Sequence, residues 1–413
     1  MAYVTRHYLE SRDFNGMPPN RLADQIGLTL EEVKELLRSL IKDELVSLNT
    51  TGNFHIKAFE DLPVEHQLKK LQEIDLRQSC LYPTTKHLKA VVDRAKYDGK
   101  PFTLRLALGE PQLKPLFFAL DVLEAYRNDP RMRYWHNDIC GGISITDEAC
   151  EADQAHERDK VFLQTFGFAY DGEMNRSVAV YACYLLALTP EHQRIWEAKL
   201  LSGDYTLHPD YYRTSIQGEF PEHWSLCEAF IMEMRIINEM TEAMGKSPLF
   251  RTVYESSNRP REFTLMIRPT QKELNSFVHL LDKLVSENFN KDFFRGDIEL
   301  EQELPRCEGK VEVRQKGTIG LLEEWLRKKV RFKDDQRFVE MIATFKKIRR
   351  HRQKPAHSVN EDEFDQRFFR EQRDLLVEAY TAIRTLRLIF ANDPRTASVK
   401  VDQALYEGKI WSY

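Results

Sequence analysis

The segment Phe345-Lys-Lys-Ile-Arg-Arg-His-Arg-Gln-Lys-Pro-Ala-His357 stands between two amphipathic patterns, and the fold of the C-terminal part is inferred from it. Before it, apolar residues recur at helical spacing over about residues 335–352, which predicts a helix with one buried stripe. Proline lacks an amide hydrogen and disfavours helical geometry at the residue before it, so we expect Pro355 to end this helix. Arg352 then lies on the last turn, and His357 lies in the bend that follows.

The chemistry of Arg352 and His357 suits a phosphate. Arginine offers a planar, permanently charged fork, and histidine exchanges a proton near neutral pH. Together they meet the minimum needs of metal-independent RNA cleavage, which are proton transfer and stabilisation of charge on phosphorus. The cations around them form a run without an acidic residue, which predicts a site for a polyanion: Lys346, Lys347, Arg349, Arg350, Arg352 and Lys354.

This segment resembles the Arg-x4-6-His signature of the HEPN superfamily, all-helical proteins of which many are ribonucleases. The resemblance implies a bundle of about four helices, a homodimer that pairs two copies of the motif, and RNA cleavage by the 2′-hydroxyl without a metal or other cofactor. Arg352 and His357 are then the catalytic pair, and a role as a toxin or in antiviral defence rests on the resemblance alone. Gln353 departs from the Asn, Asp or His that the family often has there. It is assigned to the nucleic-acid contacts together with Lys347, Arg349, Arg350 and Lys354.

Other interpretations of the same residues stay open. Arg350 also fits the longer permitted spacing, and a second Arg-x4-His pattern, Arg131 to His136, follows a turn signal and lacks long flanking helices. The helical context favours the C-terminal copy. A basic helix end that complements its own dipole, followed by a solvated histidine, is the purely structural alternative.

Composition limits what else the chain can be. Its 413 residues are enough for roughly two to four domains, and its net charge of −5 means that any nucleic-acid site is a local basic patch. The six cysteines lack metal-finger spacing, so we expect reduced thiols, no zinc and a cytoplasmic protein. The N-terminal residues lack the apolar core of a signal peptide, and no apolar run is long enough to span a membrane, so we expect no membrane contact.

Residues 1–60 are expected to form a winged helix-turn-helix. Asn20 and Thr29 are positioned to cap two helices, with Glu32 placed for a capping box, and residues 45–48 and 54–57 read as a hairpin wing. The pattern resembles the winged-helix folds of transcription regulators. DNA binding is an alternative function, although the second helix mixes acidic with basic positions: Glu31, Glu32 and Glu35 against Lys34, Arg38 and Lys42.

The remaining regions complete a mainly α fold, α+β overall. Residues 61–250 are expected to be a helical middle domain, with helices over 64–81, 85–96, 113–127, 157–166, 178–187, 190–201 and 224–244. Residues 251–315 are expected to be a small α+β segment with a strand at 261–268, a helix capped by Thr270, and a strand pair at 297–301 and 309–314. Residues 316–413 are expected to be the HEPN-like bundle, which shows three helices and needs a fourth, for which 270–286 is a candidate, and the apolar tail is expected to dock.

Three functions remain. The leading hypothesis is a metal-independent endoribonuclease or an RNA-binding relative, with RNA as its partner and a homodimer as its assembly. The second is a winged-helix DNA-binding regulator whose helical bundle only dimerises. The third is an interaction scaffold without a catalytic site.

Overall fold

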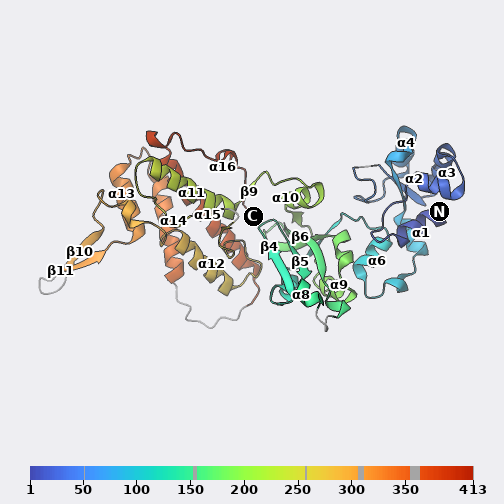
Figure 1. Ribbon diagram of the computed structural model, residues 1–413, viewed down its shortest axis with the longest axis horizontal. Helices are drawn as coiled ribbons and strands as arrows, with labels where there is room; N and C mark the ends of the chain where they lie inside the picture. Colours follow the sequence, from blue (N-terminus) through green and yellow to red (C-terminus); the bar gives the residue numbers. More distant parts are fainter. Residues whose placement is uncertain (51, 152–155, 256–257, 306–310, 354–362, 413) are drawn as a thin grey trace. The chain divides into compact units, whose positions relative to one another are not determined.

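The computed structural model describes residues 1–413 apart from 51, 152–155, 256–257, 306–310, 354–362 and 413 (Figure 1). The chain divides into two compact units, Met1–Ser215 and Ile216–Tyr413. Helices dominate the described residues and the sheets are small, which confirms the mainly α, α+β class. None of the helices in the described part is long and apolar enough to cross a bilayer.

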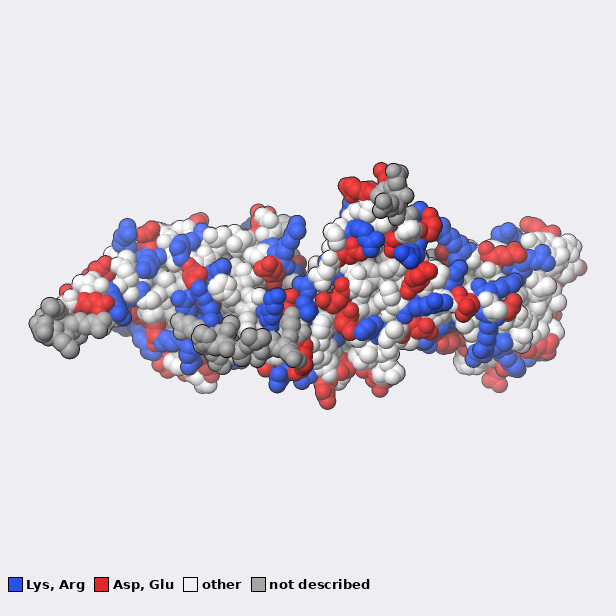
Figure 2. All heavy atoms as spheres, turned by 90° about the horizontal axis from the view of Figure 1, so that it is seen from below, with Lys and Arg blue, Asp and Glu red and all other residues white. Residues whose placement is uncertain are grey.

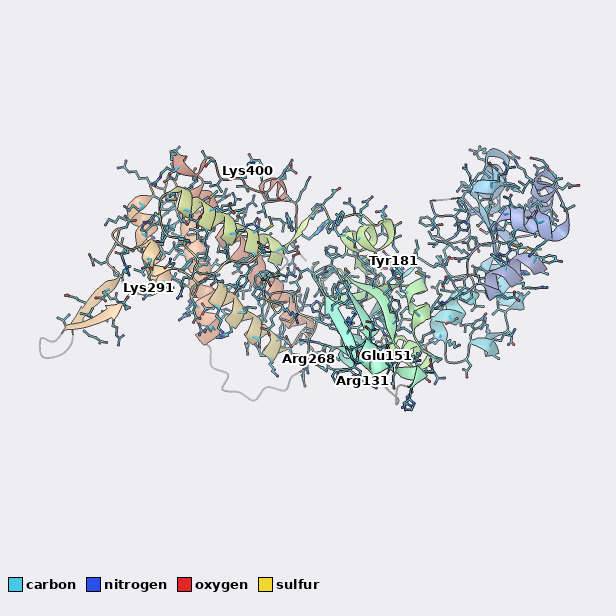
Figure 3. The ribbon with its side chains drawn as sticks, in the orientation of Figure 1. Arg131, Glu151, Tyr181, Arg268, Lys291 and Lys400 are labelled. Carbon is cyan, nitrogen blue, oxygen red and sulfur yellow. The ribbon has the colours of Figure 1, made fainter. Side chains whose placement is uncertain are left out.

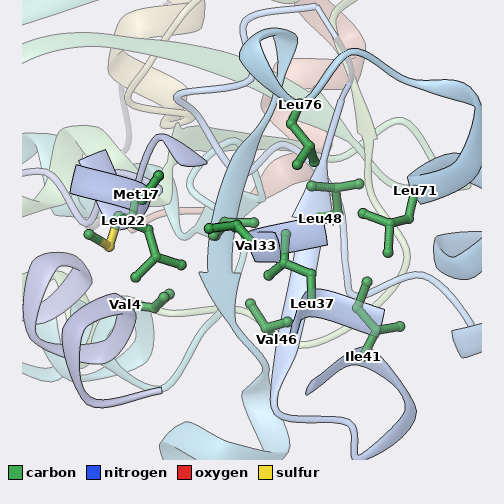
Figure 4. Packing of buried hydrophobic residues seen from close by; sticks show 12 residues of the cluster. Val4, Met17, Leu22, Val33, Leu37, Ile41, Val46, Leu48, Leu71 and Leu76 are labelled. Carbon is green, nitrogen blue, oxygen red and sulfur yellow. The ribbon is translucent and has the colours of Figure 1, made fainter. Parts of the chain in front are cut away.

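The N-terminal part of the first unit is built on two capped helices. The cap expected at Asn20 is wrong, because the first helix begins at Pro19 and Asn20 lies within it. Gly27 ends this helix in the left-handed conformation, and Thr29 and Glu32 form the expected capping box of the second. Apolar side chains from this part form one core (Figure 4), which includes Val33 and Leu37. The elements are α1 (Ala2–Glu10), α2 (Pro19–Ile26), α3 (Leu30–Lys42), β1 (Val46–Asn49), α4 (Val64–Glu73), η1 (Leu76–Gln78) and β2 (Cys80–Pro83).

The expected hairpin wing is wrong in its second strand. β1 pairs antiparallel with β2, and residues 54–57 form turns and bends instead. Asn49 explains this local structure, because its side-chain amide donates to the carbonyls of Phe54 at 3.3 Å and Ile56 at 2.8 Å. The backbone N–H of Lys57 then donates to the Gln112 side chain at 2.6 Å. These bonds hold the segment as a loop, and β2 supplies the ladder that β1 needs.

The rest of the first unit surrounds an antiparallel sheet with strand order β3-β7-β6-β5-β4, in which β8 also pairs with β6. The helices expected at 113–127, 157–166 and 178–187 are therefore largely wrong. β7 is buried at every position and β6 at most positions, and a strand covered on both faces gives a continuous apolar run that a buried helix also gives. The strands are β3 (Pro115–Phe118), β4 (Met132–His136), β5 (Cys140–Ile145), β6 (Phe162–Tyr170), β7 (Arg176–Tyr181) and β8 (Thr206–Leu207).

Short helices connect these strands. The expected starts at Val64, Thr85 and Pro190 are confirmed, and each of these helices ends earlier than expected. The connecting elements are α5 (Thr85–Val91), η2 (Arg94–Tyr97), α6 (Pro101–Ala107), η3 (Leu120–Leu123), α7 (Glu124–Arg127), α8 (Asp147–Glu151), η4 (Glu157–Asp159), η5 (Ala182–Ala187), α9 (Pro190–Glu197), α10 (Pro209–Tyr212) and the π-helical η6 (Arg213–Gln217).

The second unit is a helical bundle. Its long helices are α11 (Leu226–Ala243), α12 (Gln271–Leu284), α13 (Thr318–Lys329), α14 (Gln336–Gln353) and α15 (Gln366–Phe390). α15 packs along α11, α14 and α12, so α12 does join the expected C-terminal helices. Thr270 caps α12 as expected, and Asp365 caps α15.

The smaller elements of this unit include two corrections. The first strand of the expected pair lies at Glu301–Pro305 and not at 297–301, and it pairs with Val311–Gln315. The strand expected at 261–268 is absent from the described residues, because this segment is fixed by a side chain: Met266 N–H donates to Gln372 Oε1 at 2.8 Å, and Gln372 Nε2 donates to the Thr264 carbonyl at 3.0 Å. Trp411 docks in a parallel bridge with β9, as expected for the tail, and Tyr413 lies outside the described residues. The remaining elements are β9 (Trp224–Ser225), η8 (Lys291–Phe293), the antiparallel pair β10 (Glu301–Pro305) and β11 (Val311–Gln315), η10 (Pro394–Thr396), α16 (Gln403–Glu407) and β12 (Ile410–Trp411).

Candidate nucleic-acid site

The buried apolar face of α14 determines which way the basic side chains at its C-terminal end point. The apolar positions of α14 are buried as expected: Phe338, Met341, Ile342, Phe345 and Ile348. The long basic side chains between them therefore point away from the core of the bundle. Figure 2 shows that Lys and Arg are interspersed with Asp and Glu on the visible face, so a basic site on this protein is local.

Arg349 and Arg352 share one buried carboxylate. The Nη1 atoms of both guanidinium groups lie 2.7 Å from Oδ2 of Asp282, whose side chain is fully buried. Both also contact Oε1 of Glu287, with Arg349 at 3.4 Å. The hydrogen bonds that Arg352 donates to Asp282 and Glu287 raise its pKa, and Arg352 in turn lowers the pKa of Glu287. The two arginines are thus fixed side by side as permanent cations.

The other cations of the segment also find partners in the bundle. Lys346 pairs with Glu323 of α13 at 2.6 Å, and Lys347 pairs with Glu378 of α15 at 2.7 Å. Arg350 is exposed, and its Nε donates to the carbonyl of Lys346 at 3.3 Å. Because this acceptor is neutral, the contact does not neutralise the charge of Arg350. The run that has no acidic residue in the sequence therefore acquires acidic neighbours from three other helices.

Three of the expected site residues cannot be placed. His357 and Lys354 lie outside the described residues, and Gln353 is the last residue of α14, with its side chain outside the description. The catalytic pairing of Arg352 with His357 accordingly stays a prediction. The carboxylates that hold the arginines, Asp282 and Glu287, are the site residues that sequence reasoning missed. The sequence could have indicated them, because Asp282 and Glu287 lie near the C-terminal end of the segment that is a candidate for the fourth helix of the bundle.

The second Arg-x4-His pattern has a different environment. Arg131, labelled in Figure 3, pairs with Asp129 at 2.7 Å in the turn before β4, and His136 lies on β4 itself. Burial, together with the nearby Arg176, lowers the pKa of His136 to about 4. An imidazole with this pKa carries almost no proton near neutral pH, so it is poorly suited to return a proton to a leaving oxygen, and the C-terminal copy remains the better candidate.

The exposed face of α3 is acidic. Glu31, Glu32 and Glu35 are exposed, and Arg38 is engaged with Glu35 at 3.1 Å. Lys34 directs its amine to the carbonyl of Gln72 at 3.5 Å. Since acidic side chains repel phosphate, this face is poorly suited to the major groove of DNA.

Comparisons with known proteins leave the site without a relative. No protein-family model matches the chain, no curated protein matches its sequence, and no solved structure matches its fold.

Proposed function

We propose that the second unit binds RNA at the C-terminal end of α14 and cleaves it without a metal, as a HEPN-like endoribonuclease. The observation that supports this most strongly is the placement of Arg349 and Arg352 on the buried carboxylate of Asp282. Two guanidinium groups held at one helix end form a preorganised phosphate contact.

The geometry leaves hydrogen-bond donors for a ligand. Within the described residues, the contacts of Arg352 and of Arg349 with carboxylates all use Nη1. The Nε and Nη2 atoms form the opposite edge of each fork, which is suited to bidentate binding of a phosphate. The side chains of Arg352 and Arg349 are 27% and 39% exposed, so part of each side chain reaches solvent.

In the proposed reaction Arg352 binds the scissile phosphate and stabilises its developing charge. His357, placed by the sequence motif alone, removes the proton of the 2′-hydroxyl or returns one to the leaving oxygen. Attack by the 2′-oxygen forms a bond to phosphorus as the 5′-oxygen leaves, which yields a 2′,3′-cyclic phosphate. Lys347, Arg350 and Lys354 contact the flanking phosphates.

The first experiment measures cleavage of a mixed RNA panel, with EDTA present, by wild type, Arg352→Ala and His357→Ala. Each substitution is expected to reduce cleavage by about 10²- to 10⁴-fold. Arg337→Ala is the matched control, because Arg337 is exposed at the opposite end of the same helix, and it is expected to cleave as wild type does. Thermal unfolding of each variant separates loss of activity from loss of fold.

Two results would refute this function. If the wild type cuts no RNA at any concentration, the endoribonuclease is rejected; if all four proteins cut equally, the site at α14 is rejected. The same preparations report the proposed homodimer by light scattering, since one motif per chain requires a second copy to form the paired cleft that the resemblance implies.

A further inference from the structure

An open pocket of about 560 Å³ lies beside Arg349 in the second unit. Four cationic side chains line it, and they come from four separate places in the chain: Arg251, Lys291, Lys316 and Arg349. Glu287 is the one carboxylate among the lining residues, so four positive charges and one negative charge give the lining a net charge of +3. A concave site with this excess of positive charge selects an anion.

The hydrogen bonds of two of these cations leave their charge uncompensated. Arg251 donates from Nη2 to the backbone carbonyl of Glu287, and Lys291, labelled in Figure 3, donates from Nζ to Oε1 of Gln315 at 3.1 Å. Both acceptors are neutral. Lys316 differs, because its amine pairs at 2.7 Å with the partly exposed carboxylate of Glu324. Arg349 is likewise held by the carboxylates of Asp282 and Glu287. The excess positive charge of the pocket is therefore carried by Arg251 and Lys291.

The start of α13 adds backbone donors to the same pocket. Gly317, Thr318, Ile319 and Gly320 line it, Gly317 is the N-cap without a side-chain cap, and the first turn holds no acidic residue. A Cβ atom added at Gly317 or Gly320 would meet nothing within 4 Å, so there is room for a side chain at either position. The Thr318 hydroxyl donates to the carbonyl of Ser286 at 2.5 Å and fixes this helix start against the C-terminal end of α12.

We infer that this pocket binds a terminal phosphate group, carried by a nucleotide or by the 5′ end of an RNA. A phosphate monoester carries close to two negative charges and three strong acceptor oxygens, which match cations arriving from several directions and a row of backbone N–H donors. This site requires no cleavage chemistry and no residue outside the described range. The pocket shares Arg349 and Glu287 with the proposed ribonuclease site, and its remaining lining residues lie outside that site, so the two proposals can be tested separately.

The decisive variant is Gly320→Glu. Position 320 is the third residue of α13, where a glutamate favours the helix through the dipole and through reach back to the cap, so the fold is expected to keep or gain stability. The same carboxylate occupies the pocket and repels a phosphate. In calorimetric titration with pyrophosphate, the wild type is expected to bind, and Gly320→Glu is expected to bind at least about tenfold more weakly.

A pair of lysine variants gives an independent comparison. Lys291→Ala/Lys316→Ala removes two lining amines and is expected to weaken pyrophosphate binding by at least about tenfold. Lys272→Ala/Lys283→Ala removes the same number of charges from exposed positions of α12 outside the pocket, and is expected to stay within about twofold of wild type. Equal binding by the wild type, Gly320→Glu and both double variants overturns the inference, as does a wild type that does not bind pyrophosphate.

Two ligand series distinguish the sources of the phosphate. Matched RNA oligonucleotides with a 5′-phosphate or a 5′-hydroxyl test the RNA end, and nucleoside triphosphates against nucleosides test free nucleotides. Preference for the phosphorylated member of either series, lost in Gly320→Glu, supports the inference. Cleavage of internal RNA bonds by Gly320→Glu is expected to persist, so failure of this pocket and failure of the ribonuclease proposal give different results.

Discussion

Two arginine–carboxylate clusters in the second unit use the same chemistry in opposite environments. Arg387 of α15 contacts Glu233 of α11 inside the bundle, where their side chains are 4% and 0% exposed. Arg349 and Arg352 contact Asp282 at the edge, where the carboxylate is buried and the guanidinium groups reach solvent. In the pair of Arg387 and Glu233, called the sealed cluster below, burial raises the pKa of Glu233 and Arg387 opposes that rise. The comparison indicates that an ion pair can bind a ligand only if one partner has hydrogen-bond donors that are exposed to solvent.

The sealed cluster is expected to give the largest loss of stability when broken. Arg387→Leu leaves Glu233 buried without its guanidinium partner, which is expected to cost about 3–5 kcal/mol of unfolding free energy. The double variant Glu233→Met/Arg387→Leu replaces both charges by apolar groups and is expected to recover most of that loss. Urea unfolding measures both. A single variant as stable as the double variant would show that this pair is not sealed from water.

The open cluster, which consists of Arg349, Arg352, Asp282 and Glu287, is expected to respond to Asp282→Asn in two ways. Loss of the buried charge that holds Arg349 and Arg352 is expected to cost about 1–3 kcal/mol, because these charge-assisted bonds weaken. Total RNA binding is expected to rise, since a negative charge is removed, while cleavage falls at least about tenfold because the forks are no longer fixed. Filter binding and cleavage are measured on the same preparation. Unchanged cleavage would show that Asp282 does not position Arg352.

Acid is expected to weaken the open cluster. Arg352 lowers the pKa of Glu287 below its ordinary value of 4.5, so this carboxylate contributes stability that is present above that value and is lost as the pH falls through the lower folded-state pKa. Glu287→Gln removes the titrating group. Its unfolding free energy is expected to change less than that of the wild type between about pH 6 and about pH 3. Parallel pH profiles for the two proteins would contradict this linkage.

The smallest effect is expected for Arg350→Ala. Arg350 is exposed and its hydrogen bond is to a backbone carbonyl, so stability is expected to stay within about 0.5 kcal/mol of wild type. Loss of one phosphate contact is expected to reduce the slope of log affinity against log salt for single-stranded RNA by about 0.7. Titrations at several salt concentrations measure the slope. An unchanged slope would place Arg350 outside the RNA contact.

Local signals explain which elements were predicted. The capping box at Thr29, the cap at Thr270 and the stripe of α14 act within one or two helical turns, and each is confirmed. The sheet of the first unit was missed because β6 and β7 are buried at most or all positions, so their sequences do not alternate between apolar and polar residues. The pairing of β1 with β2 was missed because a side chain, that of Asn49, closes the intervening loop.

The candidate site divides in the same way. The sequence by itself determined that a basic helix end, with Arg349 and Arg352 on its last turns, is followed by a proline and a histidine. Only the tertiary structure decided that Asp282 and Glu287 hold these arginines, and that Lys291 and Lys316 share a pocket with the start of α13. The physical reason is range: helix periodicity and capping depend on neighbours in the chain, whereas an ion pair or a pocket depends on which helices bury their apolar faces together.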